Sequence, residues 1–420
     1  LTTRGTQSNS TFSRGNNIAA TAMPHGFNFW VPVTDAGSLS WLYRWNEHNG
    51  PDNRPRLQAL SISHQPSPWM GDRQTFQVMP STASGIPEAD RSKRALSFTH
   101  DREEARPHTY RVDFDNGIRT EIAPTERAAI FRFRFPKGDA NLLFDNVDAR
   151  GGLTLDAATQ TLHGYTDTRS GLSNGATRMF VYAQFDQPWR GSGPIETGRP
   201  TGYVKFSPGS NGEVSMRIAT SLISVEQARR NLEQEIGSTG FDTIRSRAQA
   251  AWDELLGRVQ MDGASEDQRI TVYSNLYRLF LYPNAAHENV GSNERPDWRH
   301  ADQNSWSKDN TSGDALRTSA SVREGKIYVN NGFWDTFRGQ MPLFTFLTPA
   351  QHGRYLASLL DAYDQCGWLP SWSFPGEQGS MIGNHAFTLL ADGWAKGFRT
   401  FDPQKAIEAY RHEATNKGPW

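Results

Sequence analysis

The sequence predicts a protein with an N-terminal antiparallel β-sandwich, a helical linker and a C-terminal helical domain, and three observations support this fold class. Apolar and polar residues alternate from residue 54 to about 220, which is the period of a half-buried strand. At Ser224 the apolar period becomes that of an amphipathic helix. A chain of 420 residues is also too long for one compact core. We expect the sandwich at 1–223, the linker at 224–262 and the helical domain at 263–420.

The strands of the predicted sandwich are short and separated by turn residues. In the stretch YRVDFDNGIRTEIA, Tyr110, Val112 and Phe114 share one face, and Asn116-Gly117 supplies a two-residue turn before the return strand. The stretch AIFRFRFP alternates phenylalanine with arginine, so one face is buried and the other is wet, as in an antiparallel sheet. Many such strands between Gly, Pro, Asn and Asp turns are typical of a β-sandwich.

The helices that follow begin with recognisable caps. The stretch SVEQARRNLEQEI opens with Ser224 and Gln227 in capping-box spacing, and FDTIRSRAQAAWDELLGRV continues the helical linker. The stretch SEDQRITVYSNLYRLFLYPN repeats the box with Ser265 and Gln268.

Two later helices are punctuated by proline and glycine. In TPAQHGRYLASLLDAYDQCG, Thr348 is the predicted N-cap, Pro349 takes the first helical position, and Gly367 ends the helix. DPQKAIEAYRHEAT begins in the same way at Asp402. Long antiparallel helices of this kind build an α/α toroid or a bundle.

Composition excludes several classes of partner. With 44 Lys and Arg against 45 Asp and Glu, the formal charge is -1, so we expect neither a nucleic acid nor an anionic membrane surface as partner. No run of about 18 apolar residues predicts a membrane span. The 13 Trp, 12 Tyr and 23 Phe are many for a soluble chain, and aromatic rings of this kind can stack on sugars, although most of them fill the core.

Signature motifs of several other enzyme classes are missing from the sequence. The sequence has no Gly-rich phosphate loop, no CxxC pair and no HExxH, so nucleotide and zinc chemistry lose their signatures. What remains is a set of stretches where acidic, aromatic and amide residues cluster.

The first such stretch is NGFWDTFRGQMP, residues 331–342. Asp335 and Arg338 lie three apart beside Trp334, so on a helix they share a face and could hold a polar ligand against an aromatic wall. The alternative is an intrahelical ion pair between Asp335 and Arg338.

The second stretch is FPGEQGSMIGNHA, residues 374–386, which follows WLPSWSF. Glu377 lies there in a glycine-rich loop with no basic residue nearby. A carboxyl group in an aromatic pocket has a raised pKa and could act as a general acid, whereas an ordinary loop glutamate is exposed to solvent. A further cluster, SHQPSPWMGD at 63–72, places His64, Trp69 and Asp72 together in the sandwich.

Taken in order, NGFWDTFRGQMPLFTFLTP, LLDAYDQCGWLPSW and GEQGSMIGNHAFTLLADGWAKGFRTFD resemble signature stretches of glycoside hydrolase family 92, the calcium-dependent exo-α-mannosidases. MPHGFNFW and SHQPSPWMGD are similar to N-terminal motifs of that family. The resemblance extends over nearly the whole chain. It implies that the helical domain is of the (α/α)6-barrel type and that the substrates are α-mannosides or mannose-containing glycans.

The resemblance also implies roles for individual residues. The family uses an inverting displacement in which a glutamic acid protonates the leaving oxygen, and this acid aligns with Glu377. Asp335 aligns with a ligand of sugar hydroxyls. The other substrate-binding residues that we expect are Trp334, Arg338, Trp372 and His385, with His64 and Trp69 from the sandwich.

Two departures from the family pattern leave alternatives open. If the loop register shifts by one residue, Gln378 takes the acid position, which fits members that cleave mannose-1-phosphodiesters; a non-catalytic carbohydrate-binding protein is a further alternative. The family's catalytic base and calcium ligands come from later segments, so we expect them beyond residue 420 and expect the barrel to be incomplete and inactive in this chain alone. The resemblance further implies a secreted or otherwise exported protein.

Overall fold

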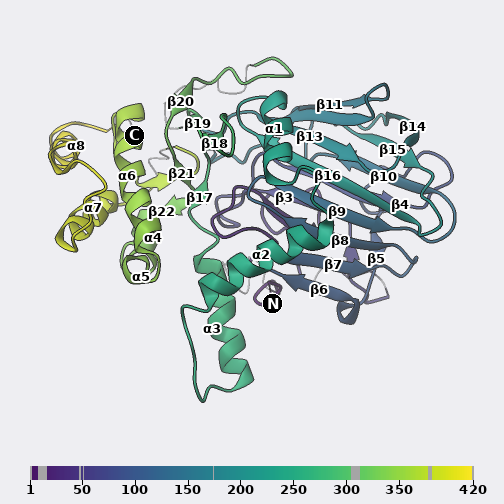
Figure 1. The fold of residues 1–420 in the computed structure, drawn as a ribbon, viewed down its shortest axis with the longest axis horizontal. Coiled ribbons are helices and arrows are strands. Elements are labelled where there is room, and N and C mark those ends of the chain that lie inside the picture. Colours follow the sequence, from purple (N-terminus) through teal and green to yellow (C-terminus); the bar gives the residue numbers. More distant parts are fainter. Residues whose placement is uncertain are drawn as a thin grey trace. The chain divides into compact units, whose positions relative to one another are not determined.

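The computed structural model describes residues 2–7, 17–46, 49–50, 52–173, 175–303, 313–376 and 381–418. The chain forms two compact units, which Figure 1 colours along the sequence. The first unit comprises Leu1–Ser170, Arg178–Leu281 and Asp314–Arg317, and the second comprises Gly171–Thr177, Tyr282–Gly313 and Thr318–Trp420.

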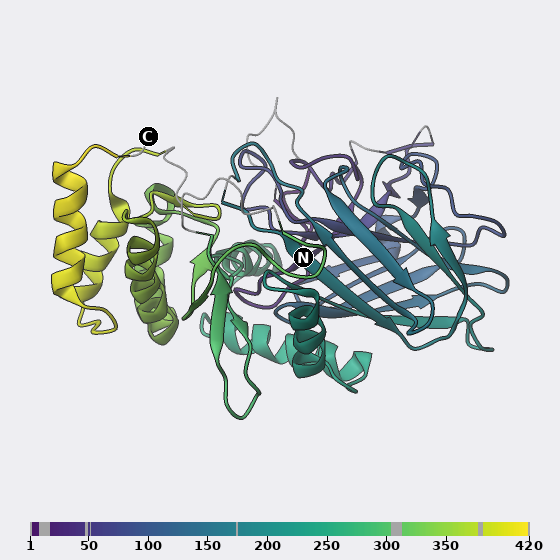
Figure 2. The same ribbon diagram turned by 90° about the horizontal axis from the view of Figure 1, so that it is seen from above.

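Two antiparallel sheets form the body of the first unit and lie face to face (Figure 2). One sheet has the spatial order β1 (Phe29–Val33), β3 (Ala59–Ser63), β4 (Phe76–Ser81), β10 (Ala140–Asp145), β15 (Gly202–Phe206) and β14 (Trp189–Pro194). The other has the order β11 (Gly151–Asp156), β12 (Thr161–Thr166), β13 (Met179–Phe185), β16 (Glu213–Ser221), β9 (Ala128–Arg134), β8 (Arg119–Pro124), β7 (Thr109–Asp113) and β6 (Glu103–Arg106). A small pair of β2 (Arg56–Leu57) and β5 (Leu96–Ser97) and the 3-10 helix η1 (His100–Arg102) complete this region.

Aromatic side chains join the two sheets into one core. The rings of Trp30 on β1 and Phe131 on β9 contact each other edge to face with centroids 5.4 Å apart. Phe131 and Phe133 are buried on the inner face, as the alternation in AIFRFRFP predicts, whereas Arg134 on the same strand is exposed. The predicted β-sandwich is therefore confirmed.

The predicted hairpin is formed by β7 and β8, but its loop is longer than expected. Tyr110 pairs with Ile122 in antiparallel register. The backbone N–H of Phe114 donates to the carbonyl of Ile118 at 2.8 Å, which leaves three residues in the loop rather than two. Gly117 takes a φ of +89°, the left-handed position that such three-residue loops need. The expectation of a two-residue turn is wrong.

Helices α1 (Val225–Glu235) and α2 (Phe241–Leu256) pack on the outer face of the larger sheet. A buried cluster between these helices and the sheet includes Ile130, Ala219, Leu232 and Phe241. α1 covers β13 and β16, and α2 covers β8 and β9. This cover explains why the middle strands of that sheet are apolar on both faces.

The predicted caps differ in how completely they form. Ser224 accepts a hydrogen bond from the N–H of Gln227, and α3 (Glu266–Leu279) has a complete capping box between Ser265 and Gln268. Helices α1, α2 and α3 belong to the same compact unit as the sandwich. The domain boundaries expected at residues 223 and 262 stay predictions.

The second unit consists of short strand pairs followed by helices. Its strands are β17 (Asn284–Ala285) paired with β21 (Tyr328–Val329), β18 (Glu288–Asn289), β19 (Trp298–Ala301) and β20 (Val322–Glu324) in one sheet, and β22 (Asn331–Gly332) paired with β23 (Trp372–Ser373). Its helices are α4 (Phe333–Thr336), α5 (Gln340–Leu347), α6 (Pro349–Cys366), α7 (His385–Ala395) and α8 (Pro403–Thr415). The expectation of a helical region after the sandwich is confirmed.

The ends of the later helices follow their sequence signals closely. α6 begins with Pro349 at its first position and ends at Gly367 with a φ of +80°. Thr348 precedes α6, but its side chain makes no capping hydrogen bond. Asp402 caps α8 by accepting a bond from the N–H of Gln404. Across the described parts of the chain, the helices are all too short or too polar to cross a lipid bilayer.

Candidate active site

The strand pair β22–β23 brings two distant stretches of the second unit together. Gly332 lies directly opposite Trp372 in this antiparallel pair. The pairing continues on both sides, because the N–H of Asn330 donates to Ser373 at 2.6 Å and that of Phe333 donates to Ser371 at 3.3 Å. α4 starts immediately after β22, so the WDTFR stretch is fixed next to the WLPSW stretch.

Gly332 allows a close approach that no other residue would allow. A Cβ atom at this position would lie 2.6 Å from Nε1 of Trp372 and would also overlap Oδ2 of Asp335. Since φ of Gly332 is -93°, the requirement for glycine comes from space and not from backbone strain. The indole edge of Trp372 and the carboxylate of Asp335 therefore lie over the same backbone atom.

The Asp335 carboxylate is open to a ligand. Partial burial raises the pKa of Asp335, and the positive charge of Arg338 opposes that rise. Among the residues that the structure describes, no ion pair within 4 Å and no hydrogen bond engages this carboxylate. The alternative of an intrahelical Asp335–Arg338 ion pair is therefore wrong, and the carboxylate can accept hydrogen bonds from hydroxyl groups.

Aromatic rings hold the basic groups beside Asp335. The guanidinium of Arg338 lies 5.0 Å from the ring centroid of Trp334 and 4.8 Å from that of Phe337. Phe337 also stacks on the imidazole of His385, with centroids 4.1 Å apart and planes 15° apart. Trp334 is 40% exposed, so one of its faces is accessible to a ligand.

His385 is positioned by the start of α7. Asn384 caps this helix by accepting a hydrogen bond from the N–H of Phe387 at 3.2 Å. Gly383 has a φ of +80°, and a Cβ there would lie 2.9 Å from Nε2 of His385. The glycine thus permits the turn that brings the His385 ring to Phe337.

The segment before the predicted acid is well packed. Glu377 and Gln378 are outside the described residues, so their roles stay predictions. Phe374 is fully buried, and its N–H donates to the carbonyl of Gly376 at 3.1 Å. Gly376 has a φ of +72°, which turns the chain immediately before Glu377.

A cavity of about 390 Å³ lies beside these elements. Its walls include Trp368, Ser371, Asn384, Tyr410 and Glu413. Ser371 precedes Trp372, and Asn384 precedes His385, but Trp372, His385 and Asp335 do not themselves line the cavity. Its mixture of aromatic and amide groups suits a sugar-sized ligand.

His64 and Trp69 belong to the first unit. His64 is buried, with Nδ1 at 3.2 Å from the carbonyl of Arg73 and Nε2 at 3.0 Å from Oδ1 of Asn28. Burial, followed by the charge of Arg73, lowers the pKa of His64 well below its usual value, so the ring is neutral at physiological pH. Trp69 is 55% exposed. Their roles as substrate-binding residues stay predictions.

The described residues do not offer a metal site. No group of three or more His, Cys, Asp or Glu side chains in the described ranges could hold an ion. Calcium favours about six to eight oxygen ligands, whereas two carboxylates supply at most about four. The residues present here therefore do not fit calcium by themselves.

Two residues of the site were not predicted as functional. Gly332 is important only because Trp372 lies opposite it, and that pairing has no signal in the sequence. Phe337 lies in the same aromatic stretch as Asp335, but its contacts with both Arg338 and His385 depend on the fold. The one available signal is the density of aromatic residues around Asp335.

Comparisons with known proteins identify relatives of both parts. The model described as "Glycosyl hydrolase family 92 N-terminal domain" matches residues 2–221, and that described as "Glycosyl hydrolase family 92 catalytic domain" matches residues 227–420. A protein of Arthroderma benhamiae, named an uncharacterized secreted glycosidase, is 24% identical over 367 residues, which are 78% of this chain and 41% of that protein.

Solved structures show the same similarity. A family GH92 inverting mannosidase from Bacteroides thetaiotaomicron superposes with a TM-score of 0.87 at 31% identity, covering 99% of this chain and 55% of that one. An α-mannosidase of the same family and organism gives a TM-score of 0.80 at 22% identity, covering 99% and 56%, and supports the fold alone. The chain spans about half the length of these relatives.

Proposed function

Because the chain belongs to glycosyl hydrolase family 92, we propose that the protein releases α-linked mannose from the non-reducing ends of mannosides by an inverting, calcium-dependent mechanism with Glu377 as general acid. The observation that best supports this proposal is the pairing of Gly332 with Trp372, because it gathers Asp335, Trp372 and the start of the Glu377 loop in one region of the second unit.

The proposed reaction assigns a distinct task to each group. A water molecule attacks the anomeric carbon from one face of the sugar while the bond to the leaving oxygen breaks on the other. Glu377 in its protonated form gives its proton to that oxygen, so the aglycone leaves as a neutral alcohol. The group that removes the proton from water is not assigned to any residue of this chain.

The remaining candidates would bind the sugar. Asp335 would accept hydrogen bonds from ring hydroxyls, and Arg338 and His385 would donate to them. Trp334 and Trp372 would stack on the apolar faces of the ring. Phe337 would act on the substrate only through Arg338 and His385, because it holds both of them.

Calcium dependence is part of the proposal and rests on the family alone. Because the described residues do not supply a calcium site, no step of the proposed reaction is assigned to the ion. The measurement is mannose release by dialysed protein before and after chelation and after calcium is added back. Unchanged turnover after exhaustive chelation would remove calcium from the proposal.

Export is also proposed, because one relative is named a secreted glycosidase. Fractionation of the native source tests it: the protein should be found outside the cytoplasm, and its recovery in the cytoplasm alone would contradict export.

The decisive experiment compares two neighbouring variants of the protein that the complete coding sequence encodes. Release of mannose is measured from α-mannobioses and from a mannose-1-phosphodiester. We expect Glu377→Gln to lower turnover of mannobiose by about 10²- to 10⁴-fold and to spare the phosphodiester, whose leaving group needs no proton. Gln378→Ala is the matched control and should keep both activities.

Other outcomes identify the alternatives. Loss of activity in Gln378→Ala but not in Glu377→Gln would place the acid position one residue later. Turnover of the phosphodiester alone by the wild-type protein would indicate the phosphodiester-cleaving type. Saturable mannoside binding without any turnover, unchanged in Glu377→Gln, would indicate a carbohydrate-binding protein.

A further inference from the structure

A groove on the first unit shares no lining residue with the proposed mannosidase site. It has a volume of about 290 Å³, near the lower end of the range for small-molecule sites. Strands β6, β7 and β8 form one wall, and α2 forms the other. Since α2 covers β8 and β9, the outer faces of β6 and β7 remain open beside it.

The strand wall consists of charged side chains in cross-strand register. Glu104 pairs with Arg111, and Arg111 pairs with Glu121, so the three lie in a row across the sheet. Their neighbours Tyr110 and Ile122 point into the sandwich core and are fully buried. The alternation of the strands therefore forces the charged row to the outer face.

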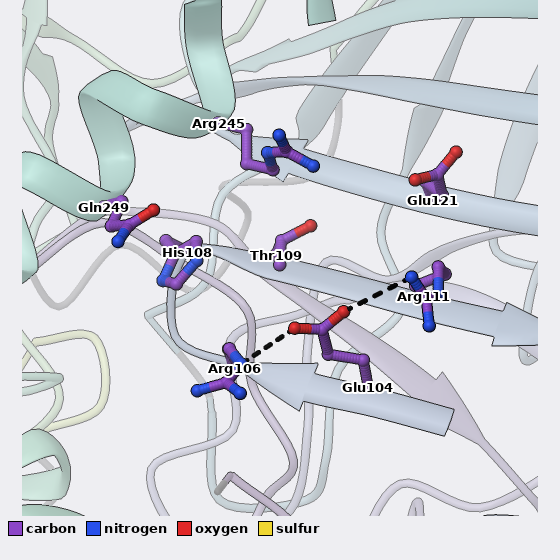
Figure 3. Close-up of a pocket in the computed structure, with 8 residues that line it drawn as sticks. All are labelled: Glu104, Arg106, His108, Thr109, Arg111, Glu121, Arg245 and Gln249. Atoms are coloured by element: carbon purple, nitrogen blue, oxygen red, sulfur yellow. Dashed lines mark hydrogen bonds and ion pairs between the residues drawn. The ribbon is translucent and has the colours of Figure 1, made fainter. Parts of the chain in front are cut away.

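The negative charges of this row are already neutralised. Glu121 accepts two hydrogen bonds from Arg132, at 2.8 and 3.1 Å, which use both of its oxygens. Glu104 pairs with Arg106 at 2.8 Å and lies 3.7 Å from Arg111 (Figure 3). One carboxylate thus faces two arginines, and with Arg245 of α2 the groove is lined by three arginines and two glutamates.

Arg111 has unused hydrogen-bonding capacity. Its ion-pair distances, 3.7 Å to Glu104 and 4.0 Å to Asp113, are both longer than a hydrogen bond. Its Nε atom is shielded from solvent and has no hydrogen-bond partner in the described structure. The Arg111 side chain is 40% exposed, so a ligand oxygen in the groove can reach its guanidinium group.

The helix wall adds a third cation to Arg106 and Arg111. Arg245 and Gln249 lie one turn apart on α2 and both line the groove, and Figure 3 shows Arg245 on the opposite side from Arg111. The partner of Arg245 is Asp242, at 3.2 Å, whose side chain is 66% exposed and outside the groove. Ion pairs of this exposed kind contribute little, so Arg245 is available to a ligand.

His108 completes the polar lining at the turn between β6 and β7. Burial, followed by the charge of Arg106, lowers the pKa of His108, so its ring is neutral at pH 7 and can donate one hydrogen bond. No Trp, Tyr or Phe lines the groove. A neutral sugar would therefore lack the ring on which sugars stack, whereas an oxyanion would meet guanidinium groups from two sides.

We propose that this groove binds a phosphate or sulfate group, with Arg245 and Arg111 as its principal ligands. Guanidinium groups match the oxygens of such anions with paired hydrogen bonds. Glu104 balances the charge of the groove when no anion is bound and competes with one. The group could be a free inorganic anion or an ester on a sugar, and these share the same recognition chemistry. The proposal does not depend on the mannosidase assignment.

The test titrates inorganic phosphate and sulfate by calorimetry into the protein that the complete coding sequence encodes, at constant ionic strength set with chloride. We expect saturable binding. Arg245→Gln should weaken it about tenfold, since it removes one charge-assisted pair. Arg247→Gln is the matched control, because Arg247 lies on the same helix outside the groove, and it should change the affinity less than about twofold.

Glu104→Gln should act in the opposite direction and strengthen binding, because it removes the competing charge while keeping a hydrogen-bond acceptor for Arg106. A hexose 6-phosphate that binds more tightly than inorganic phosphate, beside the same neutral hexose that does not bind, would identify an ester; equal affinities would identify the bare anion. Absence of saturable binding, equal losses in Arg245→Gln and Arg247→Gln, or binding of the neutral hexose in this groove would overturn the proposal.

Discussion

The imidazole ring of His385 stacks on the phenyl ring of Phe337, with the ring centroids 4.1 Å apart. The same phenyl ring lies against the guanidinium of Arg338. One apolar side chain thus positions two basic groups that come from separate segments of the second unit. This arrangement makes Phe337 a positioning residue whose removal should affect substrate binding rather than folding.

Phe337→Leu tests this role in the complete protein. An aromatic pair contributes about 0.5–1.5 kcal/mol beyond its buried area, so we expect KM for mannobiose to rise about two- to tenfold with kcat nearly unchanged. Phe346→Leu is the matched control, because Phe346 is 69% exposed and should leave both constants unchanged. An equal fall in kcat and kcat/KM would argue against a positioning role.

Gly332→Ala should disturb the packing of Asp335 and Trp372 against the Gly332 backbone. The new methyl group would overlap both side chains, and overpacking of this kind costs about 1–3 kcal/mol. We expect that loss in the free energy of unfolding measured with denaturant. At Gly339 a Cβ meets no atom within 4 Å, so Gly339→Ala should change the stability by less than about 0.5 kcal/mol. Equal stabilities of the two variants would contradict the close approach.

A buried ion cluster in the sandwich predicts a larger effect. Asp145 is fully buried and contacts Arg94 at 2.7 Å and Arg199 at 3.0 Å. Burial alone would raise the pKa of Asp145, but hydrogen bonds and ion pairs with Arg199 and Arg94 outweigh it and lower that pKa. Asp145→Asn should cost about 3–5 kcal/mol of stability, because it leaves buried arginine charge without a counterion.

The matched control for that variant is Glu226→Gln. Glu226 pairs with Arg229 at 2.7 Å on the surface of α1, with both side chains exposed. Exposed pairs of this kind contribute about 0–1 kcal/mol. Similar losses of stability in Asp145→Asn and Glu226→Gln would show that the buried cluster contributes no more to stability than an exposed ion pair.

Asp72 predicts a pH-dependent stability. It is fully buried, and burial raises its pKa to about 6, although Oδ1 accepts hydrogen bonds from the N–H groups of His64 and Arg73. Because the folded pKa exceeds the unfolded value, its stabilising contribution is complete below pH about 4 and is lost as the pH rises to about 6. Above that pH, the wild type should be less stable than Asp72→Asn by about 3 kcal/mol.

Denaturant unfolding of both proteins between pH 4 and pH 8 measures this difference. Asparagine keeps the acceptor oxygen and removes only the titration, so the two stability curves should diverge up to pH about 6 and then run parallel. A difference that stays constant over the whole range would mean that Asp72 titrates at its ordinary pKa.

Periodicity predicted much of the first unit because its strands are long enough to show it. The phenylalanines of β9 and the partners Tyr110 and Ile122 are buried as the alternation requires. The loop after β7 differs from the expected turn because the side chain of Asn116 accepts a hydrogen bond from the N–H of Ile118, which closes three residues instead of two. Local polar contacts of this kind decide loop length and leave no periodic signal.

For the candidate site, the sequence predicted the residues but not their arrangement. Residue type and resemblance predicted Asp335, Trp372 and His385 as site residues. They did not predict the geometry that places Asp335 and Trp372 against Gly332. Strands β22 and β23 have two residues each, too few to form a pattern. Their pairing is decided by tertiary contacts, and so the importance of Gly332 becomes visible only in the fold.

The segment Gly171–Thr177 has a consequence for how the gene can be divided. It belongs to the second unit although the chain on both sides of it belongs to the first, and the backbone of Gly175 lies against the carbonyls of Pro375 and Gln303. The chain changes unit after residues 170, 177, 281, 313 and 317. No single cut therefore releases either unit whole, and recombination at one junction would split a unit. Segments of the two units alternate along the chain. A domain exchange or a truncation must therefore keep both units together.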